Sequence, residues 1–228
     1  MDKKDDQYMK NKRAFERTVI YHMPQRTIST FGNTIYTYYF VAKSKGNQTT
    51  VHEGALHIKT PLIVTPYFSS KDTFHNIDKD AVQFAEQLME KMNFPFTFIE
   101  YYFHNVERET WRENQPFSEV LIKLTRLLEQ DKNDRSILFS GEEATWSISL
   151  VKACMKIIEM SMQTNLTEIE ERGLLDKNGI PKALEKKIEA LFKRAQRDKN
   201  QINMLGSLLL KHDIFDYYED RFFKLIKR

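Results

Sequence analysis

This sequence of 228 residues is poor in the residue types that build covalent and phosphate-binding sites. It has one cysteine, Cys154, which excludes an internal disulfide and a zinc site made of thiolates. With only 7 glycines it has little room for glycine-rich loops, and a Walker-type loop, a G-x-G-x-x-G fingerprint and a G-x-S-x-G nucleophile elbow are all missing. The sequence therefore offers no motif for nucleotide binding through such loops or for serine hydrolysis, and we expect no cofactor.

Charge of one sign and long apolar runs are also scarce. Lysine and arginine number 35 against 32 aspartates and glutamates, and the formal net charge of +3 falls far short of that of a dedicated DNA-binding protein. No segment approaches an uninterrupted membrane span, and the first 17 residues lack the apolar core of a signal peptide. Together with the lone thiol, these features predict a cytoplasmic protein without membrane contact.

The first part of the chain has the texture of β-strands. From Thr18 to Pro66, β-branched and aromatic residues dominate, and the segment KSKGNQ contains the glycine and asparagine that suit a hairpin connection. The period then changes. A helix that Asp78 would cap, a strand, a second helix and a short strand are predicted at residues 78–93, 96–108, 116–131 and 136–139.

The second half of the chain has the pattern of helices. Ser140 and Glu143 have the spacing of a capping box ahead of a long apolar periodic run, and Thr167 and Glu170 repeat that spacing. Gly173 is placed to end the helix that follows. Further helices are predicted up to the end of the chain.

These elements predict an α+β fold, with a mostly antiparallel N-terminal sheet and its packed helices followed by a helical C-terminal half. We expect a flexible tail at residues 1–13, an α+β domain at residues 14–173 and a C-terminal helical extension at residues 174–228. The segment LLDKNGIP, from Leu174 to Pro181, is the best candidate for the boundary.

Three polar residues in the strand predicted at residues 96–108 are of the types that form an acid–base site. Glu100 and His104 share a strand face and Glu107 lies just beyond, so a small hydrolase or nuclease that uses these three residues is one hypothesis. The simpler interpretation is a half-buried strand whose polar side chains meet solvent or a helix. His52 and His57 are five residues apart and point to opposite faces of a regular strand, so no metal site is predicted.

The run TIYTYYFVAK places Tyr36, Tyr38 and Phe40 on one face of a strand. Exposed among lysines, such rings would form a stacking platform for single-stranded nucleic acid, which keeps RNA as an alternative partner that binds at Tyr36 and Tyr38. Both faces of this strand are substantially apolar, however, which favours a strand covered by helices. We therefore expect the rings to lie in the core.

The C-terminal run DIFDYYEDRFFKLIKR predicts a helix with a wide apolar arc. Phe215, Tyr218 and Phe222 lie on one stripe of this helix, and Arg221 lies on the stripe beside it. A terminal helix of this kind docks on its own domain or binds another chain, where aromatic residues and arginine are favoured. Since no catalytic constellation is evident, our leading hypothesis is a non-enzymatic interaction protein that uses these residues to bind a protein partner or a second copy of itself.

Overall fold

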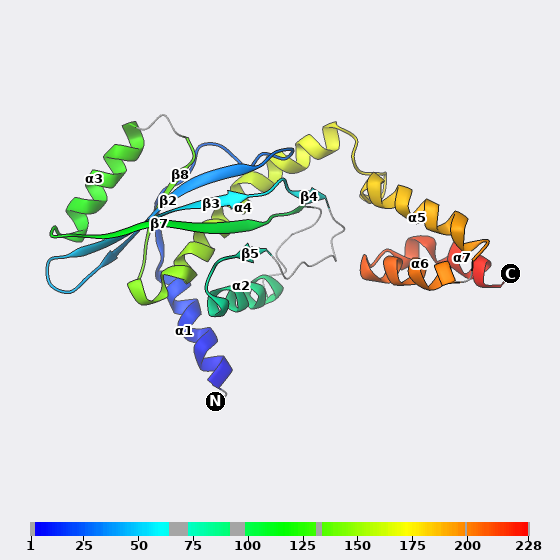
Figure 1. The fold of residues 1–228 in the computed structure, drawn as a ribbon, viewed down its shortest axis with the longest axis horizontal. Helices are drawn as coiled ribbons and strands as arrows, with labels where there is room; N and C mark the ends of the chain where they lie inside the picture. The colour runs from blue at the N-terminus through cyan, green and yellow to red at the C-terminus, as the bar shows by residue number, and fades with distance from the viewer. Residues whose placement is uncertain (1–2, 64–72, 92–98, 131–133, 199, 228) are drawn as a thin grey trace. The chain divides into compact units, whose positions relative to one another are not determined.

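The computed structural model describes residues 3–63, 73–91, 99–130, 134–198 and 200–227 (Figure 1). The chain divides into two compact units. The first contains the described residues up to Pro61, residues 73–91, and the described part of residues 101–165. The second contains Leu62, Ile63, Ile99, Glu100 and the described residues from Leu166 onward. The domain limits predicted from the sequence stay a prediction.

The first unit is built on a mixed sheet that has six strands in the described part of the chain. The strand order is β1 (Val19–His22), β8 (Ser136–Ser140), β2 (Thr34–Lys43), β3 (Thr49–Ile58), β7 (Phe103–Glu113) and β5 (Phe74–His75). β2 is parallel to β8 and β5 is parallel to β7, while the other neighbouring strands are antiparallel. With helices in the C-terminal half, this arrangement confirms the predicted α+β fold.

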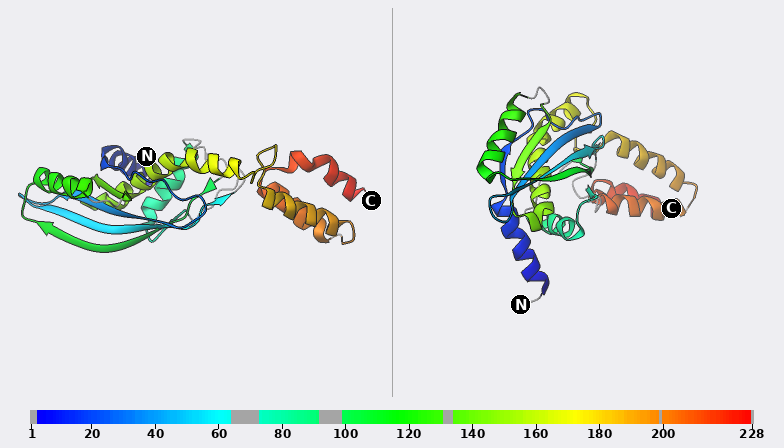
Figure 2. Two further views of the ribbon diagram at one scale, coloured as in Figure 1. Left: turned by 90° about the horizontal axis from the view of Figure 1, so that it is seen from above. Right: turned by 60° about the vertical axis from the view of Figure 1, so that its left-hand side comes forward.

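β2 and β3 form the predicted hairpin, and together with β7 they make the long, curled middle of the sheet (Figure 2). In the connection, Ser44 donates its N–H to the Gln48 carbonyl at 2.9 Å. Gly46 has a φ of 69°, a left-handed backbone conformation that glycine adopts without a steric cost. The turn chemistry that the sequence supplies is therefore the chemistry that the hairpin uses.

The two faces of β2 are covered by different helices. On one face, Phe40 lies beside His52 of β3, and the His52 ring stacks on Trp146 of α4 (Trp146–Glu171) with 5.3 Å between ring centroids. On the opposite face, Val41 joins a cluster with α3 (Phe117–Gln130). The buried members of this cluster are Val41, Val51, Val120, Leu124, Leu128 and Leu138. The face with Phe40 is covered by α4, and the opposite face is covered at Val41 but exposed at Ile35, which agrees with the expectation that helices cover at least one side of this strand.

A helix at residues 3–17 covers most of the segment predicted as a tail at residues 1–13. α1 spans Lys3–Arg17, and Phe15 packs against Phe84 of α2 (Lys79–Lys91) with 5.8 Å between ring centroids. Lys152 of α4 donates to the carbonyls of Phe15 and Thr18, each at 2.9 Å. An ammonium group placed on carbonyls at a helix C-terminus stabilises that end. These contacts come from residues far away in the sequence, so the local pattern did not reveal the helix.

Of the helix starts predicted from the sequence, the structure confirms the one at Asp78 and contradicts the one at Ser140. Asp78 caps α2 as predicted, because its Oδ1 accepts the N–H of Asp80 at 2.9 Å. The capping box predicted at Ser140 and Glu143 is wrong. Ser140 ends β8, its hydroxyl donates to the Tyr21 hydroxyl at 3.3 Å, and the short helix η1 (Glu143–Thr145) precedes α4 without a side-chain cap.

The second unit has a helical core of its own, made by α5 (Lys182–Ala195), α6 (Asn200–Lys211) and α7 (Phe215–Ile226). Its buried residues are Ile180, Ile188, Leu191, Phe192, Leu205, Leu209, Ile214 and Phe222. In the same unit, β4 (Leu62–Ile63) pairs antiparallel with β6 (Ile99–Glu100).

α4 continues through Thr167 and Glu170, so these two residues do not start a helix. Gly173 follows the end of α4 with a φ of 59° and closes the helix as predicted. Among the described residues, no helix combines the length and apolar character needed to cross a membrane.

Candidate functional site

The three residues predicted as an acid–base group lie on two different strands. Glu100 lies in β6, which belongs to the second unit, and its side chain is buried. His104 and Glu107 lie in the regular part of β7, where His104 pairs with His57 and Glu107 pairs with Gly54. Because successive side chains of a strand alternate, these two residues, three apart, point to opposite faces of the sheet. Their role in catalysis remains a prediction without geometric support.

Tyr36 and Tyr38 lie in the core, as expected for the aromatic strand. Both side chains are fully buried, with 0% exposure. The Tyr36 hydroxyl donates to the Arg26 carbonyl at 2.8 Å, and the Tyr38 hydroxyl donates to Asn105 Oδ1 at 3.0 Å. Burial raises the pKa of both phenols. A base could stack on these rings only if the sheet and α4 separated.

The residues predicted to bind a partner on α7 are mostly used inside the second unit. Phe222 is buried, and Phe215 and Tyr218 are half-buried against the same core. Arg221 remains exposed and forms a two-pronged ion pair with Glu189 of α5, in which Nη2 donates to Oε2 at 2.7 Å. This pairing lowers the pKa of the Glu189 carboxyl. These contacts attach α7 to α5.

Sequence reasoning missed the apolar residues that the helices of the second unit leave in solvent. On α7, Tyr217 is 62% exposed, Ile226 50% and Phe223 43%. On α6, Leu210 is 68% exposed and Met204 58%. The sequence signal for exposed apolar residues on α7 was the width of its apolar arc. One packing partner cannot cover so wide an arc, so part of the apolar surface stays exposed.

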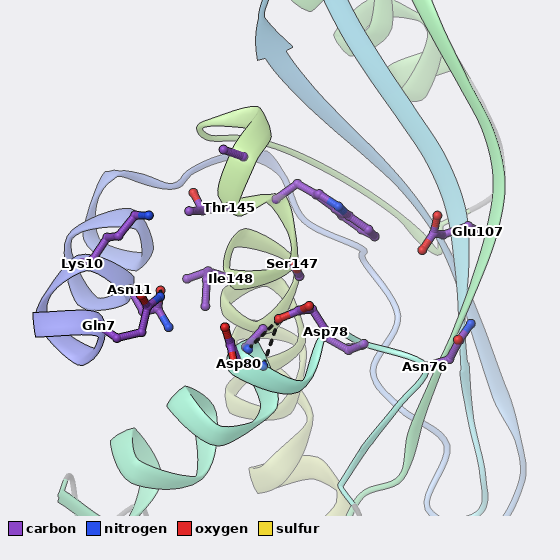
Figure 3. Close-up of a pocket in the computed structure, with 14 residues that line it drawn as sticks. Gln7, Lys10, Asn11, Asn76, Asp78, Asp80, Glu107, Thr145, Ser147 and Ile148 are labelled. Carbon is purple, nitrogen blue, oxygen red and sulfur yellow. Dashed lines mark hydrogen bonds between the residues drawn. The ribbon is translucent and has the colours of Figure 1, made fainter. Parts of the chain in front are cut away.

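The first unit has a polar pocket with a volume of about 730 Å³ (Figure 3). It lies between Lys10 of α1, Asp78 and Asp80 at the start of α2, Glu107 of β7 and the start of α4. Three of these charged side chains are carboxylates and one is a lysine, so the pocket disfavours phosphates and other anions. Asp78 is already engaged as the cap of α2, and its role is structural.

In one wall of the pocket, Asn76 forms a reciprocal pair of amide hydrogen bonds with Asn105. Asn76 Nδ2 donates to the Asn105 carbonyl at 2.7 Å, and Asn105 Nδ2 donates to the Asn76 carbonyl at 3.2 Å. Asn105 is fully buried, and Asn76 has a φ of 56°, which asparagine tolerates better than most residues. This reciprocal pair fixes the end of β5 against β7.

His52 lies near two carboxylates without forming a catalytic pair. Its Nδ1 lies 3.2 Å from the Thr110 hydroxyl, and its Nε2 is buried without a hydrogen-bond partner among the described residues. Burial lowers the pKa of His52, although Glu143 and Glu107 act in the opposite direction. Burial therefore favours the neutral imidazole, and the group hydrogen-bonded to its Nδ1 is the exposed Thr110 hydroxyl of β7.

The remaining candidates for chemistry have structural roles. Cys154 is buried in α4, and burial raises the pKa of its thiol, so the reactive thiolate is strongly disfavoured. The Ser140 hydroxyl is bonded to Tyr21. Among the described residues, no group of three or more His, Cys, Asp and Glu side chains is arranged to hold a metal ion in the conformation of this structure.

Comparison with known protein families, curated proteins and solved structures finds no match for this chain. Any functional conclusion therefore depends on the geometry of the chain itself.

Proposed function

We propose that this protein is a non-enzymatic interaction protein that binds protein through α7 of its C-terminal unit, and that the partner is a second copy of the chain. One observation carries the proposal: α7 keeps the large apolar side chains of Phe223 and Ile226 half in solvent beside a core that is already filled. Apolar side chains that folding leaves exposed are a source of binding free energy when a partner covers them.

Phe223 is held in one position before any partner arrives. Its ring meets Phe215 edge-on with 6.1 Å between centroids and Phe222 edge-on with 6.2 Å. Ile226 follows Phe223 by three residues, which places both side chains on the same side of the helix. A rigid aromatic anchor loses little conformational entropy on binding, and residues of this type dominate the energy of interfaces.

The charges on α7 favour a second copy as the partner. Exposed acidic residues occupy the first half of the helix, namely Asp216, Glu219 and Asp220, and exposed lysines occupy its end, at Lys224 and Lys227. If two α7 helices pack antiparallel about a two-fold axis at Phe223, Glu219 of each copy faces Lys227 of the other. Exposed ion pairs contribute little energy, so we assign affinity to the apolar residues and orientation to the charges.

Sedimentation equilibrium over a concentration series tests this proposal. We expect a reversible dimer that Phe223→Asp weakens at least about tenfold, a loss of about 1.4 kcal/mol. Tyr217→Asp is the matched control, because Tyr217 is also aromatic and even more exposed but lies on a different side of α7. Glu219→Lys and Lys227→Glu should each weaken the dimer, and the double variant should restore it.

Two other outcomes are informative. A monomer that captures a different protein through Phe223, insensitive to Tyr217→Asp, would retain the interaction function and reject self-association. A protein that stays monomeric and captures no partner would reject the function as a whole. The alternative hypotheses gain no support from the geometry, because His104 and Glu107 point to opposite sheet faces and Tyr36 and Tyr38 are buried.

A further inference from the structure

Three of the six histidines of the chain lie side by side in one row across the sheet of the first unit. His57 of β3 pairs with His104 of β7, and His104 pairs in turn with His75 of β5. Directly paired residues on neighbouring strands project from the same face and lie about 5 Å apart. All three side chains are exposed. The row is therefore a contiguous surface of imidazole rings.

This row lies on the sheet face that carries α3, but α3 does not cover it. Val51, six residues before His57 in the same strand, packs beneath α3. Side chains an even number of residues apart share a face, so His57 is on that face. The row ends at Ile35 of β2, which pairs with His57 and is 46% exposed. The imidazoles are thus open to solvent.

The backbone holds the three histidines in this register. β5 has only two residues in the sheet, but Phe103 donates its N–H to the Thr73 carbonyl at 2.8 Å just before the paired positions. Just after them, the reciprocal amide bonds of Asn76 and Asn105 close the strand pair. Because both ends of β5 are fixed, His75 cannot slide away from His104.

A structural role explains this row poorly. The rings are exposed, and like charges on neighbouring strands destabilise a sheet. Neutral imidazole, in contrast, is the commonest protein ligand of first-row transition metals. The row contains no carboxylate, so it does not resemble the oxygen-rich sites that Mg²⁺ and Ca²⁺ require.

We propose that His57, His104 and His75 form a binding site for a first-row divalent transition metal such as Zn²⁺, Ni²⁺ or Cu²⁺, with His104 as the central ligand. The rings do not converge on one point as they stand, so binding turns these exposed side chains into other staggered rotamers. Two or three imidazoles coordinate the ion and water completes its shell. Such an ion ties the short edge strand β5 to β7 and β3, and stabilises the folded unit by mass action.

Titration calorimetry on the chain without an affinity tag, with ZnCl₂, NiCl₂, CuCl₂ and MgCl₂ as probes, tests the site. We expect one Zn²⁺, Ni²⁺ or Cu²⁺ per chain and no saturable Mg²⁺ binding. Loss of an outer-shell partner of a ligand already costs about 10- to 100-fold in metal affinity, so His104→Gln should cost at least about tenfold. His22→Gln is the matched control, since His22 lies in β1 of the same sheet but outside the row, and it should leave the affinity unchanged.

A second measurement separates loss of a ligand from loss of structure. Zn²⁺ should raise the melting temperature of the wild-type chain and of His22→Gln. It should not raise the melting temperature of His104→Gln, and the circular dichroism spectrum of that variant should match that of the wild type. Affinity should fall on acidification, because a coordinating imidazole must be neutral. Absence of saturable binding, equal affinity in His104→Gln, or one ion per two chains would each overturn the proposal.

Discussion

The Tyr38 hydroxyl of β2 passes over β3 and donates a hydrogen bond of 3.0 Å to Asn105 Oδ1 of β7. The strand it crosses has a glycine at that point, and a Cβ added at Gly54 would lie 2.3 Å from the Tyr38 oxygen. The register of β3 and β7 also shifts between Glu53 and Gly54. One buried side chain thus joins the two strands that flank β3, because the strand between them carries no side chain there.

Gly54→Ala should destabilise the protein. The added methyl group would overlap the Tyr38 ring, which is fully buried and anchored through its hydroxyl to Asn105. Overpacking of this kind costs about 1–3 kcal/mol, measurable as a lower midpoint of urea unfolding. Gly46→Asn is the control, because nothing lies within 4 Å of a Cβ at Gly46 and asparagine tolerates its φ of 69°. If Gly54→Ala is as stable as the wild type, the Tyr38 side chain does not pass close over β3 at Gly54.

Tyr38→Phe should also destabilise the protein, for a different reason. The change keeps the buried ring but removes the donor to Asn105 Oδ1, and Asn105 is fully buried. A buried acceptor left without its partner costs about 1–3 kcal/mol. Tyr217→Phe, which removes a hydroxyl from an exposed ring, should change the unfolding free energy by much less. If both variants unfold alike, the hydrogen bond contributes nothing.

The stability of the protein should fall as the pH decreases below about 7, partly through His52. Burial lowers the pKa of His52 in the folded state, so between the folded and unfolded pKa values only the unfolded chain takes up the proton. His212, whose pKa is also lowered chiefly by burial, acts in the same direction. Urea unfolding at several pH values should give a shallower pH dependence for His52→Gln. A slope identical to that of the wild type would show that His52 is not desolvated.

Cys154 should be unreactive in the folded protein. The thiol is fully buried and burial raises its pKa, so a disulfide reagent such as DTNB finds neither access nor thiolate. One thiol per chain should react in denaturant, and the native rate should follow the opening of the first unit. Destabilising variants such as Gly54→Ala should therefore react faster than the wild type. Rapid labelling of the native wild type would mean that α4 leaves Cys154 accessible.

Local signals in the sequence located several elements because the interactions concerned are local. Asp78 caps α2 through an amide only two residues away, and Gly173 closes α4 through its own backbone conformation. Tyr36 and Tyr38 were placed correctly in the core, since alternation and apolar character on both faces of one strand require nothing from distant residues. The same reasoning failed for Ser140, whose place in β8 depends on pairing with Val19 of β1.

The candidate sites were much harder to predict. His104 and Glu107 are close in sequence to each other and to Glu100, but strand alternation points His104 and Glu107 to opposite faces of the sheet. On α7, periodicity identified the apolar arc but not which part of it the unit's own core would cover. Exposure of Phe223 became visible only in the packed structure.

By itself, the sequence determined the α+β class, the buried position of the aromatic strand and the turns and caps that rely on neighbouring residues. Tertiary structure alone decided that His57, His104 and His75 stand in one row, that Tyr38 reaches Asn105, and that α1 is a helix. The physical reason is that period and propensity act over a few residues. Strand register and side-chain contact, in contrast, are set by the pairing of segments that lie tens of residues apart.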